Sequence, residues 1–190
     1  AKKLIAKADV LIENFLPGTM DNLGLGYEVA SAINKRLIYC AITGYGQTGP
    51  SKDDAGYDFM IQAQGGLMAI TGPADGEPFK AGVALTDVIT GLHAANAILA
   101  ALHHREHSGD GQFIDVALFD AQVASLVNVA HNALAGAPAQ RYGNAHASIV
   151  PYQSFATSDG FIALAVGNDA QYRRLCDVIQ REDLSHDARY

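Results

Sequence analysis

The sequence predicts an α/β fold with a parallel sheet, followed by the start of a smaller α+β domain. Two observations predict the sheet. Apolar runs at residues 9–12 and 37–43 have the length of strands, and the amphipathic segment 27–34 lies between them. Strand, helix and strand in this order are typical of a parallel βαβ unit. A third observation, a hairpin pattern late in the chain, predicts the smaller domain.

The elements up to residue 50 follow from apolar runs and turn residues. Residues 2–7 are interpreted as the tail of a helix, and residues 14–24 hold turn residues with one helical turn. After the second strand, residues 44–50 (GYGQTGP) form a glycine-rich loop. Such a loop lets the backbone approach a ligand closely at the carboxyl end of a parallel strand, although it could equally be a flexible surface loop.

The middle of the chain carries longer apolar patterns broken by turn residues. They predict a helix at 58–68, a loop at 73–79, a short apolar strand at 81–85, a long helix at 87–107, a strand at 112–118 and a helix at 120–134. The long helix runs into SGDG at 108–111, which is a strong helix stop.

The hairpin pattern consists of two apolar runs, 152–157 and 161–166, on either side of Ser-Asp-Gly. Asn168 and Asp169 then suit the start of a last helix, because their side chains can accept hydrogen bonds from free backbone N–H groups.

Residues 136–150 show little periodicity and separate the two patterns. We therefore expect a large-domain segment at 1–135, a linker at 136–150 and the start of a small domain at 151–190. The chain lacks an initiator Met and opens as if inside a helix, so we expect both of its ends to be cut.

Composition limits the function classes. The chain has 190 residues, of which 49% are hydrophobic and 17% charged, so it can bury a sizeable core. A net charge of −7 without a dense basic run disfavours a nucleic-acid partner. Cys40 and Cys176 have no CxxC spacing, which favours reduced, buried thiols and a cytoplasmic location. No apolar run reaches membrane-spanning length, so we expect no membrane partner.

Asp87 is the most informative single residue. It stands where the short apolar segment gives way to the long helix, and the helix dipole would favour its ionised form there. The strand–helix junction of an α/β sheet faces the usual ligand crevice, so Asp87 could attack an activated acyl group. The alternative is that Asp87 is an N-cap and nothing more, since Asp is a preferred cap residue.

Other motifs have simpler explanations. Residues 103–107 contain H-x-x-E-H, a zinc-protease pattern, but they fall in the last turn of the long helix, where such side chains suit the dipole. We therefore expect no metal site. Asp58 is interpreted as the N-cap of its own helix, and Asp115 and Asp120 as structural residues. No GxGxxG or Walker loop is present in the sequence.

Seven segments together resemble the family III coenzyme A transferases, the CaiB/BaiF type that includes formyl-CoA and carnitine-CoA transferases. They occur in family order and cover nearly the whole chain: Val10–Gly18, Thr43–Pro50, Gly56–Gly66, Ala84–Gly91, Ser108–Val116, Tyr142–Tyr152 and Phe161–Asp169. No single segment is decisive, but their joint occurrence is specific.

The resemblance implies a Rossmann-like large domain, a smaller domain and an interlocked homodimer. It places the nucleophile at Asp87, in the segment ALTDVITG. It assigns Asn14 and Phe15 to the CoA pocket, and Tyr45 and Gln47 to the loop near the reacting thioester. Family members often carry a basic residue where this chain has Asn22, which puts a phosphate contact there in doubt.

The function implied is transfer of CoA from an acyl-CoA donor to a carboxylic acid, through an anhydride and a thioester formed on Asp87. Coenzyme A and acyl-CoA are then substrates, and no cofactor is permanently bound. Two alternatives stay open besides the zinc protease: an α-methylacyl-CoA racemase and an inactive CoA-binding fragment. Racemases of this family carry a histidine base where this chain has Tyr57, and tyrosine is a poor base near neutral pH.

Overall fold

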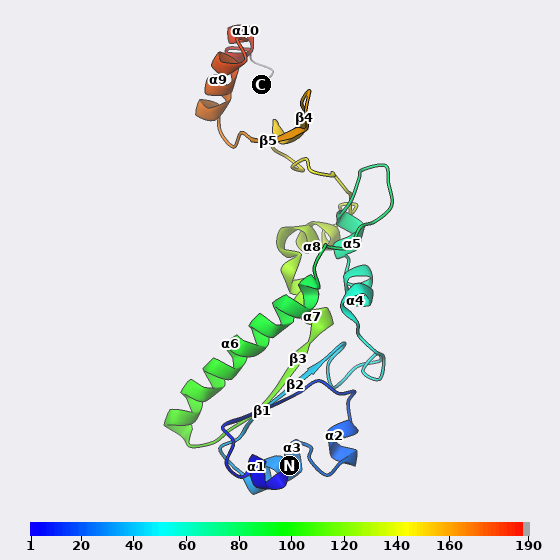
Figure 1. Ribbon diagram of the computed structural model, residues 1–190, viewed down its shortest axis with the longest axis vertical. Helices are drawn as coiled ribbons and strands as arrows, with labels where there is room; N and C mark the ends of the chain where they lie inside the picture. The colour runs from blue at the N-terminus through cyan, green and yellow to red at the C-terminus, as the bar shows by residue number, and fades with distance from the viewer. Residues whose placement is uncertain (188–190) are drawn as a thin grey trace. The chain divides into compact units, whose positions relative to one another are not determined.

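The computed structural model describes residues 1–187 and divides the chain into two compact units, each described by itself (Figure 1). The first unit comprises residues 1–70 and 78–139, and the second comprises residues 71–77 and those from 140 onwards. Neither the linker at 136–150 nor the start of the small domain at 151 is tested by this division, and both stay predictions.

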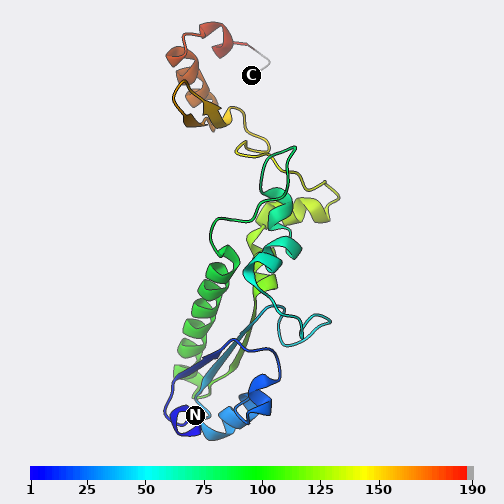
Figure 2. The ribbon, with the colours of Figure 1, turned by 45° about the vertical axis from the view of Figure 1, so that its right-hand side comes forward.

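The first unit is built on a parallel sheet with strand order β1-β2-β3 (Figures 1 and 2). Its elements, in chain order, are α1 (Lys2–Ile5), β1 (Val10–Glu13), α2 (Thr19–Asn22), α3 (Tyr27–Ile33), β2 (Ile38–Thr43), α4 (Asp58–Gln64), α5 (Leu67–Ile70), α6 (Leu85–Ser108), β3 (Phe113–Ala117), α7 (Leu118–Ser125) and α8 (Val127–Leu134). The predicted βαβ unit is confirmed, because β1 and β2 pair in parallel with Val10 opposite Ile38.

The central strand β2 is covered on both faces, as a parallel strand requires. Leu37, Tyr39 and Ala41 pack with Ile5 of α1 and Ala30 of α3 in one buried cluster. Ile38 and Cys40 point to the opposite face, since side chains alternate along a strand, and they are also fully buried. Helix α6 packs against β2 and β3. The fold therefore brings the carboxyl ends of β2 and β3 together with the start of α6.

Three predicted elements differ from the structure. The helix expected at 58–68 is interrupted at Gly65–Gly66, where Gly66 adopts φ +88° and ends α4. The helix expected at 120–134 starts earlier, at Leu118, and breaks between Ser125 and Val127. Residues 81–84 form no strand, and α6 begins at Leu85. Asp87 is therefore the third residue of α6 and does not lie at a strand–helix junction.

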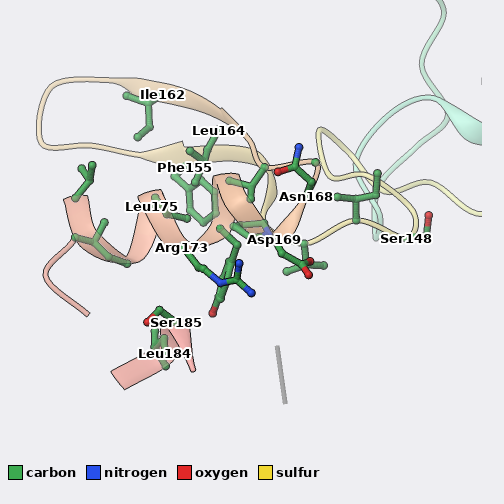
Figure 3. Close-up of a pocket in the computed structure, with 18 residues that line it drawn as sticks. Ser148, Phe155, Ile162, Leu164, Asn168, Asp169, Arg173, Leu175, Leu184 and Ser185 are labelled. Carbon is green, nitrogen blue, oxygen red and sulfur yellow. The ribbon is translucent and has the colours of Figure 1, made fainter. Parts of the chain in front are cut away.

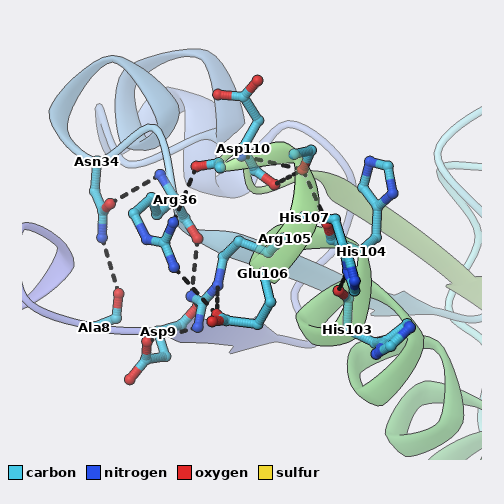
Figure 4. A network of polar contacts seen from close by, with 12 residues as sticks. Ala8, Asp9, Asn34, Arg36, His103, His104, Arg105, Glu106, His107 and Asp110 are labelled. Atoms are coloured by element: carbon cyan, nitrogen blue, oxygen red, sulfur yellow. Dashed lines mark hydrogen bonds and ion pairs between the residues drawn. The ribbon is translucent and has the colours of Figure 1, made fainter.

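A buried arginine joins the last turn of α6 to the beginnings of β1 and β2 (Figure 4). Arg105 is 6% exposed, and its guanidinium donates to the carbonyl oxygens of Arg36 at 3.0 Å and Asp9 at 3.4 Å. It also donates to Asp9 Oδ1 at 2.9 Å. Gly109 closes the helix in the left-handed conformation, with φ +83°, so the predicted stop is confirmed.

By length and composition α6 is apolar enough to cross a membrane, which corrects the expectation that no segment reaches that length. This is weak evidence, because the core helix of a soluble protein passes the same test. Ala94, Ala101 and Arg105 lie on its buried face, whereas Val88 and Leu92 on its other face are exposed.

The second unit contains an antiparallel hairpin and two helices: β4 (Tyr152–Ala156), β5 (Phe161–Ala165), α9 (Asp169–Val178) and α10 (Glu182–Ser185). The predicted hairpin is confirmed, with Ala156 opposite Phe161. The predicted cap of the last helix is confirmed as well, because Asn168 Oδ1 accepts the N–H of Gln171 at 3.0 Å. Cys40 in the first unit and Cys176 in the second are both buried free thiols.

Candidate functional site

Asp87 lies exposed in the first turn of α6, and a residue from another helix caps that turn. The N-cap position is Ala84, whose side chain cannot accept a hydrogen bond. Asp58 Oδ1 accepts the backbone N–H of Thr86 at 2.8 Å and that of Asp87 at 3.4 Å. Two expectations from the sequence are therefore wrong. Asp87 is not the N-cap of α6. Asp58 is not the N-cap of α4, which is Tyr57; its carboxylate caps α6 instead.

Gln62, one turn after Asp58 on α4, fixes the orientation of that carboxylate. It is 0% exposed, and its Nε2 donates to Asp58 Oδ2 at 2.6 Å. Its Oε1 accepts the N–H of Ala81 at 2.8 Å. The same side chain thus holds both Asp58 and the segment that leads into α6. A buried amide with both ends paired is a rigid support.

The buried side of the α6 start is held by Thr86, Thr90 and Gln122. The Thr86 hydroxyl donates to Gln122 Oε1 at 2.6 Å, and the Thr90 hydroxyl donates to the Thr86 carbonyl at 2.7 Å. Gln122 comes from α7 and is 0% exposed. Its Nε2 has no hydrogen-bond partner within residues 1–187. Two helices, α4 and α7, therefore fix the turn that carries Asp87.

The surroundings of Asp87 raise its pKa, whereas the helix dipole alone would lower it. Partial burial raises the pKa of the Asp87 carboxyl above its usual value, and the negative charge of Asp58 raises it further. A carboxyl group with a raised pKa holds a more basic carboxylate once it is ionised.

The glycine-rich loop after β2 is held against the start of α4. A Cβ on Gly44 would lie 2.5 Å from Gly56 Cα, so only glycine fits at this contact. The N–H of Gly46 donates to Thr43 Oγ1, and that of Gln47 donates to Asp115 Oδ2, both at 2.9 Å. These two N–H groups are used within the fold, so they are not available to a reacting oxyanion.

Tyr45 links this loop to α4. Its hydroxyl is hydrogen-bonded to Gln64 Oε1 on α4, and its ring lies 5.9 Å from that of Phe119 on α7. Asp58, which caps the turn of Asp87, is on the same helix α4. Helix α4 thus contacts Tyr45 through Gln64 and the turn of Asp87 through Asp58. That Tyr45 and Asp87 belong to one site stays a prediction.

Gln47 also lines a second feature, a cavity of about 100 Å³ beyond the carboxyl end of β1. Glu13 and Asp21 give the cavity an acidic lining, and Tyr39 forms part of its wall. Burial raises the pKa of Glu13, and burial together with Glu13 and Asp21 raises the pKa of Tyr39 to about 12. An acidic cavity does not favour a phosphate group.

Asn14 and Phe15 follow β1 directly. Phe15 is exposed, and its N–H donates to Glu13 Oε2 at 2.9 Å. Neither residue lines the 100 Å³ cavity, and the contacts described above do not bring either of them to Asp87. Their assignment to a CoA pocket stays a prediction.

The histidines at the end of α6 interact with each other and with the helix backbone (Figure 4). The rings of His103 and His107 lie 4.9 Å apart, edge to face, and His107 Nδ1 is 3.0 Å from the His103 carbonyl oxygen. Within residues 1–187 no group of three His, Cys, Asp or Glu side chains is placed to hold a metal ion.

The second unit has a large apolar cavity of about 1040 Å³ (Figure 3). Phe155, Ile162 and Leu164 of the hairpin and Leu175 of α9 line it, with Arg173 among the few polar residues. None of the residues expected in the site from the sequence lines it.

Comparison with known proteins identifies relatives over the full length of the chain. Residues 1–190 match the family model of CoA-transferase family III. The chain is 50% identical to the succinate–glutarate CoA-transferase of Agrobacterium fabrum over 100% of its own length and 48% of that protein. It is 49% identical to the succinyl-CoA:glutarate CoA-transferase of Mus musculus, over 100% of its own length and 44% of the mouse protein.

The fold has a counterpart among solved structures. The crystal structure of a CaiB/BaiF family protein from Brucella suis is 50% identical in sequence and superimposes with a TM-score of 0.86, covering 100% of this chain and 50% of that one. The chain thus spans about half the length of the relatives that it matches.

Proposed function

Because the chain belongs to CoA-transferase family III, we propose that its protein transfers coenzyme A from an acyl-CoA donor to a carboxylic acid, with Asp87 as the nucleophile. The observation that carries this proposal is the placement of Asp87: an exposed carboxylate on a helix turn that Asp58 holds from outside and Thr86 and Gln122 hold from inside. A nucleophile needs access to substrate and a fixed backbone, and this turn offers both.

The proposed reaction has four steps, all on the Asp87 carboxyl. The carboxylate oxygen attacks the donor thioester carbon, the C–S bond breaks, and CoA leaves as a thiolate from a mixed anhydride. The thiolate then attacks the Asp87 carbonyl carbon of that anhydride, which releases the donor acid and forms an aspartyl-CoA thioester. The acceptor carboxylate attacks this thioester and releases the thiolate from a second anhydride. Finally the thiolate attacks the acceptor carbonyl carbon, forms the product acyl-CoA and restores the Asp87 carboxylate.

The raised pKa of Asp87 suits the first of these steps. A more basic carboxylate is a stronger nucleophile toward a carbonyl carbon, provided that it is ionised at the working pH. Tyr45 of the glycine-rich loop is hydrogen-bonded to Gln64 on α4, the helix that also carries Asp58, and we assign it to the region near the thioester on the family resemblance. Gln47 is assigned to the same loop near the thioester, although its N–H is already bonded to Asp115.

For the substrates we propose short dicarboxylic acids, with succinyl-CoA and glutarate as the first pair to test. The support is that relatives 50% and 49% identical carry the names succinate–glutarate and succinyl-CoA:glutarate CoA-transferase. These transferase names also favour CoA transfer over the racemisation considered from the sequence. An interlocked homodimer, a completed small domain, Asn14 and Phe15 as CoA contacts, and a cytoplasmic location belong to the same proposal, on the family resemblance alone.

Mass spectrometry of the intermediate tests the nucleophile directly. The protein is incubated with succinyl-CoA without acceptor and quenched with hydroxylamine, which converts an aspartyl thioester or anhydride into a hydroxamate. We expect the hydroxamate on the peptide that contains Asp87 and on no other acidic peptide. A hydroxamate on another residue, or none in protein that turns over succinyl-CoA and glutarate, contradicts the assignment. Asp120→Asn, which removes a carboxylate from the first turn of α7, is the control that should label normally.

A further inference from the structure

We propose that Asp58 is a positioning residue for Asp87: its carboxylate fixes the first turn of α6 and places a second negative charge beside the nucleophile. The inference rests on the proposed function, because it assigns Asp58 a part in the reaction of Asp87. It concerns a residue whose sequence context, the first position of α4, indicates only a cap for its own helix.

The geometry shows a carboxylate committed to α6. One oxygen of Asp58 accepts the N–H groups of Thr86 and Asp87 at 2.8 and 3.4 Å, and the other accepts Gln62 Nε2 at 2.6 Å. Two oxygens that accept from three donors are typical of an ionised carboxylate. One of these donors is the backbone N–H of Asp87 itself, so the Asp58 side chain is bonded directly to the residue that carries the nucleophile.

Among the charged groups around this turn, Asp58 is the one that raises the pKa of Asp87. The pKa of Asp87 is raised by partial burial and by Asp58. The elements packed against α6 are α4, α7, β2 and β3. The other titratable groups on these elements, together with the nearest one on α6, are Asp120, Tyr39, Cys40, Asp115 and His93.

Two consequences follow for the reaction. The capped turn fixes the backbone that carries the Asp87 carboxylate, which lowers the entropic cost of reaching the thioester carbon. The second charge disfavours ionised Asp87, so that its carboxylate is more basic and more reactive than an isolated aspartate. The attack on the thioester spreads the charge of Asp87 into the substrate, which relieves the repulsion.

Three variants of the native protein test this role. Asp58→Asn keeps an acceptor oxygen for the two N–H groups but removes the charge, whereas Asp58→Glu keeps the charge on a longer side chain. Asp120→Asn is the charge-matched control in the first turn of α7. Each is assayed with succinyl-CoA and glutarate across the acid range for kcat and kcat/KM. In parallel, the Asp87 carboxyl is titrated by carbon NMR and assigned by its absence in Asp87→Asn.

We expect Asp58→Asn to lower kcat by roughly 10- to 100-fold, and to move both the acid limb of the kcat profile and the titration of Asp87 to lower pH. Asp58→Glu should keep the wild-type acid limb with an intermediate kcat, and Asp120→Asn should match the wild type. A folded Asp58→Asn protein with wild-type kcat and an unshifted Asp87 titration overturns the inference.

If Asp58→Asn does not fold, the role of Asp58 is tested by Asp58→Glu and by the titration of Asp87 in the unmodified protein. A raised Asp87 pKa that Asp58→Glu preserves supports the role, and an Asp87 pKa at or below the ordinary aspartate value contradicts it. The proposed function and the role of Asp58 can be refuted separately. If Asp87→Asn turns over substrate at the wild-type rate, the proposed function is wrong. If Asp87→Asn is inactive but Asp58→Asn behaves like the wild type, only the role of Asp58 is wrong.

Discussion

The Thr86 hydroxyl donates a hydrogen bond to Gln122 Oε1 at 2.6 Å, although 36 residues separate the two in the chain. Both side chains are fully buried, so this bond joins α6 to α7 on the inner side of the turn that carries Asp87. Gln122 is held on its other flank by Gly65, where a Cβ would lie 2.5 Å from Gln122 Cγ. The amide therefore has little freedom to find another partner.

We expect Thr86→Val to destabilise the first unit by about 1–3 kcal/mol, the typical effect of leaving a buried acceptor unpaired. Val has nearly the shape of Thr, so packing is conserved while Gln122 loses its donor. Thr90→Val is the matched control: its hydroxyl donates to the Thr86 carbonyl, which lies within the helix hydrogen-bond ladder, so its loss should cost clearly less. Urea unfolding of both variants measures the difference, and equal costs would contradict the argument.

Gly44→Ala should disrupt the glycine-rich loop, because the added Cβ would meet Gly56 Cα at 2.5 Å. Backbone cannot yield as a flexible side chain does, so we expect a loss of stability and of CoA transfer. Gly91→Ala is the opposite case on α6, since nothing lies within 4 Å of its Cβ position, and alanine is the better helix former by about 0.5–1 kcal/mol. Urea unfolding of Gly44→Ala and Gly91→Ala compares their stabilities. Equal stability of the two variants would show that the Gly44–Gly56 contact is not tight.

Much of the architecture could be predicted from local sequence patterns. The strands at Val10–Glu13 and Ile38–Thr43, the hairpin and the cap at Asn168 each depend on residues within one segment. The break between α7 and α8 was missed because no glycine or proline marks it; Val127 itself adopts φ +44°. The end of α4 at Gly65–Gly66 had a visible signal, two adjacent glycines, which the apolar pattern across them outweighed.

The support of Asp87 could not be predicted, because it depends on side chains distant in the sequence. Asp58 is 28 residues from Thr86, and no local rule distinguishes a cap on its own helix from a cap on another. Gln62 and Gln122 are fully buried, whereas glutamine is usually exposed, so no local pattern marks either as part of this support. Asp87 itself was found through its position near the start of α6, although the expected strand before it does not form.

Arg105→Ala should destabilise the first unit by about 1–3 kcal/mol, because the carbonyl oxygens of Arg36 and Asp9 lose their guanidinium donor inside the fold. Arg36→Ala is the matched control in the same network. It removes an exposed ion pair with Glu106 at 3.2 Å but keeps the Arg36 carbonyl, so we expect a cost within about 1 kcal/mol. Chemical denaturation measures the free energy of unfolding of both variants. A larger loss for Arg36→Ala than for Arg105→Ala would contradict the stabilising role assigned to the buried Arg105.

Asp87→Asn should abolish CoA transfer, by at least about three orders of magnitude, without destabilising the fold. The pKa of Asp87 is raised in the folded state by partial burial and by Asp58, so folding favours its protonated form. The contribution of the Asp87 carboxyl to folding stability is therefore neutral at a pH below the ordinary aspartate pKa. It becomes unfavourable as the pH rises through the raised pKa, and it stays unfavourable above that pKa.

Asn removes that penalty, so we expect Asp87→Asn to match or exceed the wild type in thermal stability at neutral pH. This advantage in stability should vanish at acid pH, where the Asp87 carboxyl is protonated in both the folded and the unfolded state. Thermal unfolding of both proteins across the acid-to-neutral range checks the sign. A variant that is less stable than the wild type at neutral pH would mean that the Asp87 charge stabilises the turn, and that its environment favours rather than opposes ionisation.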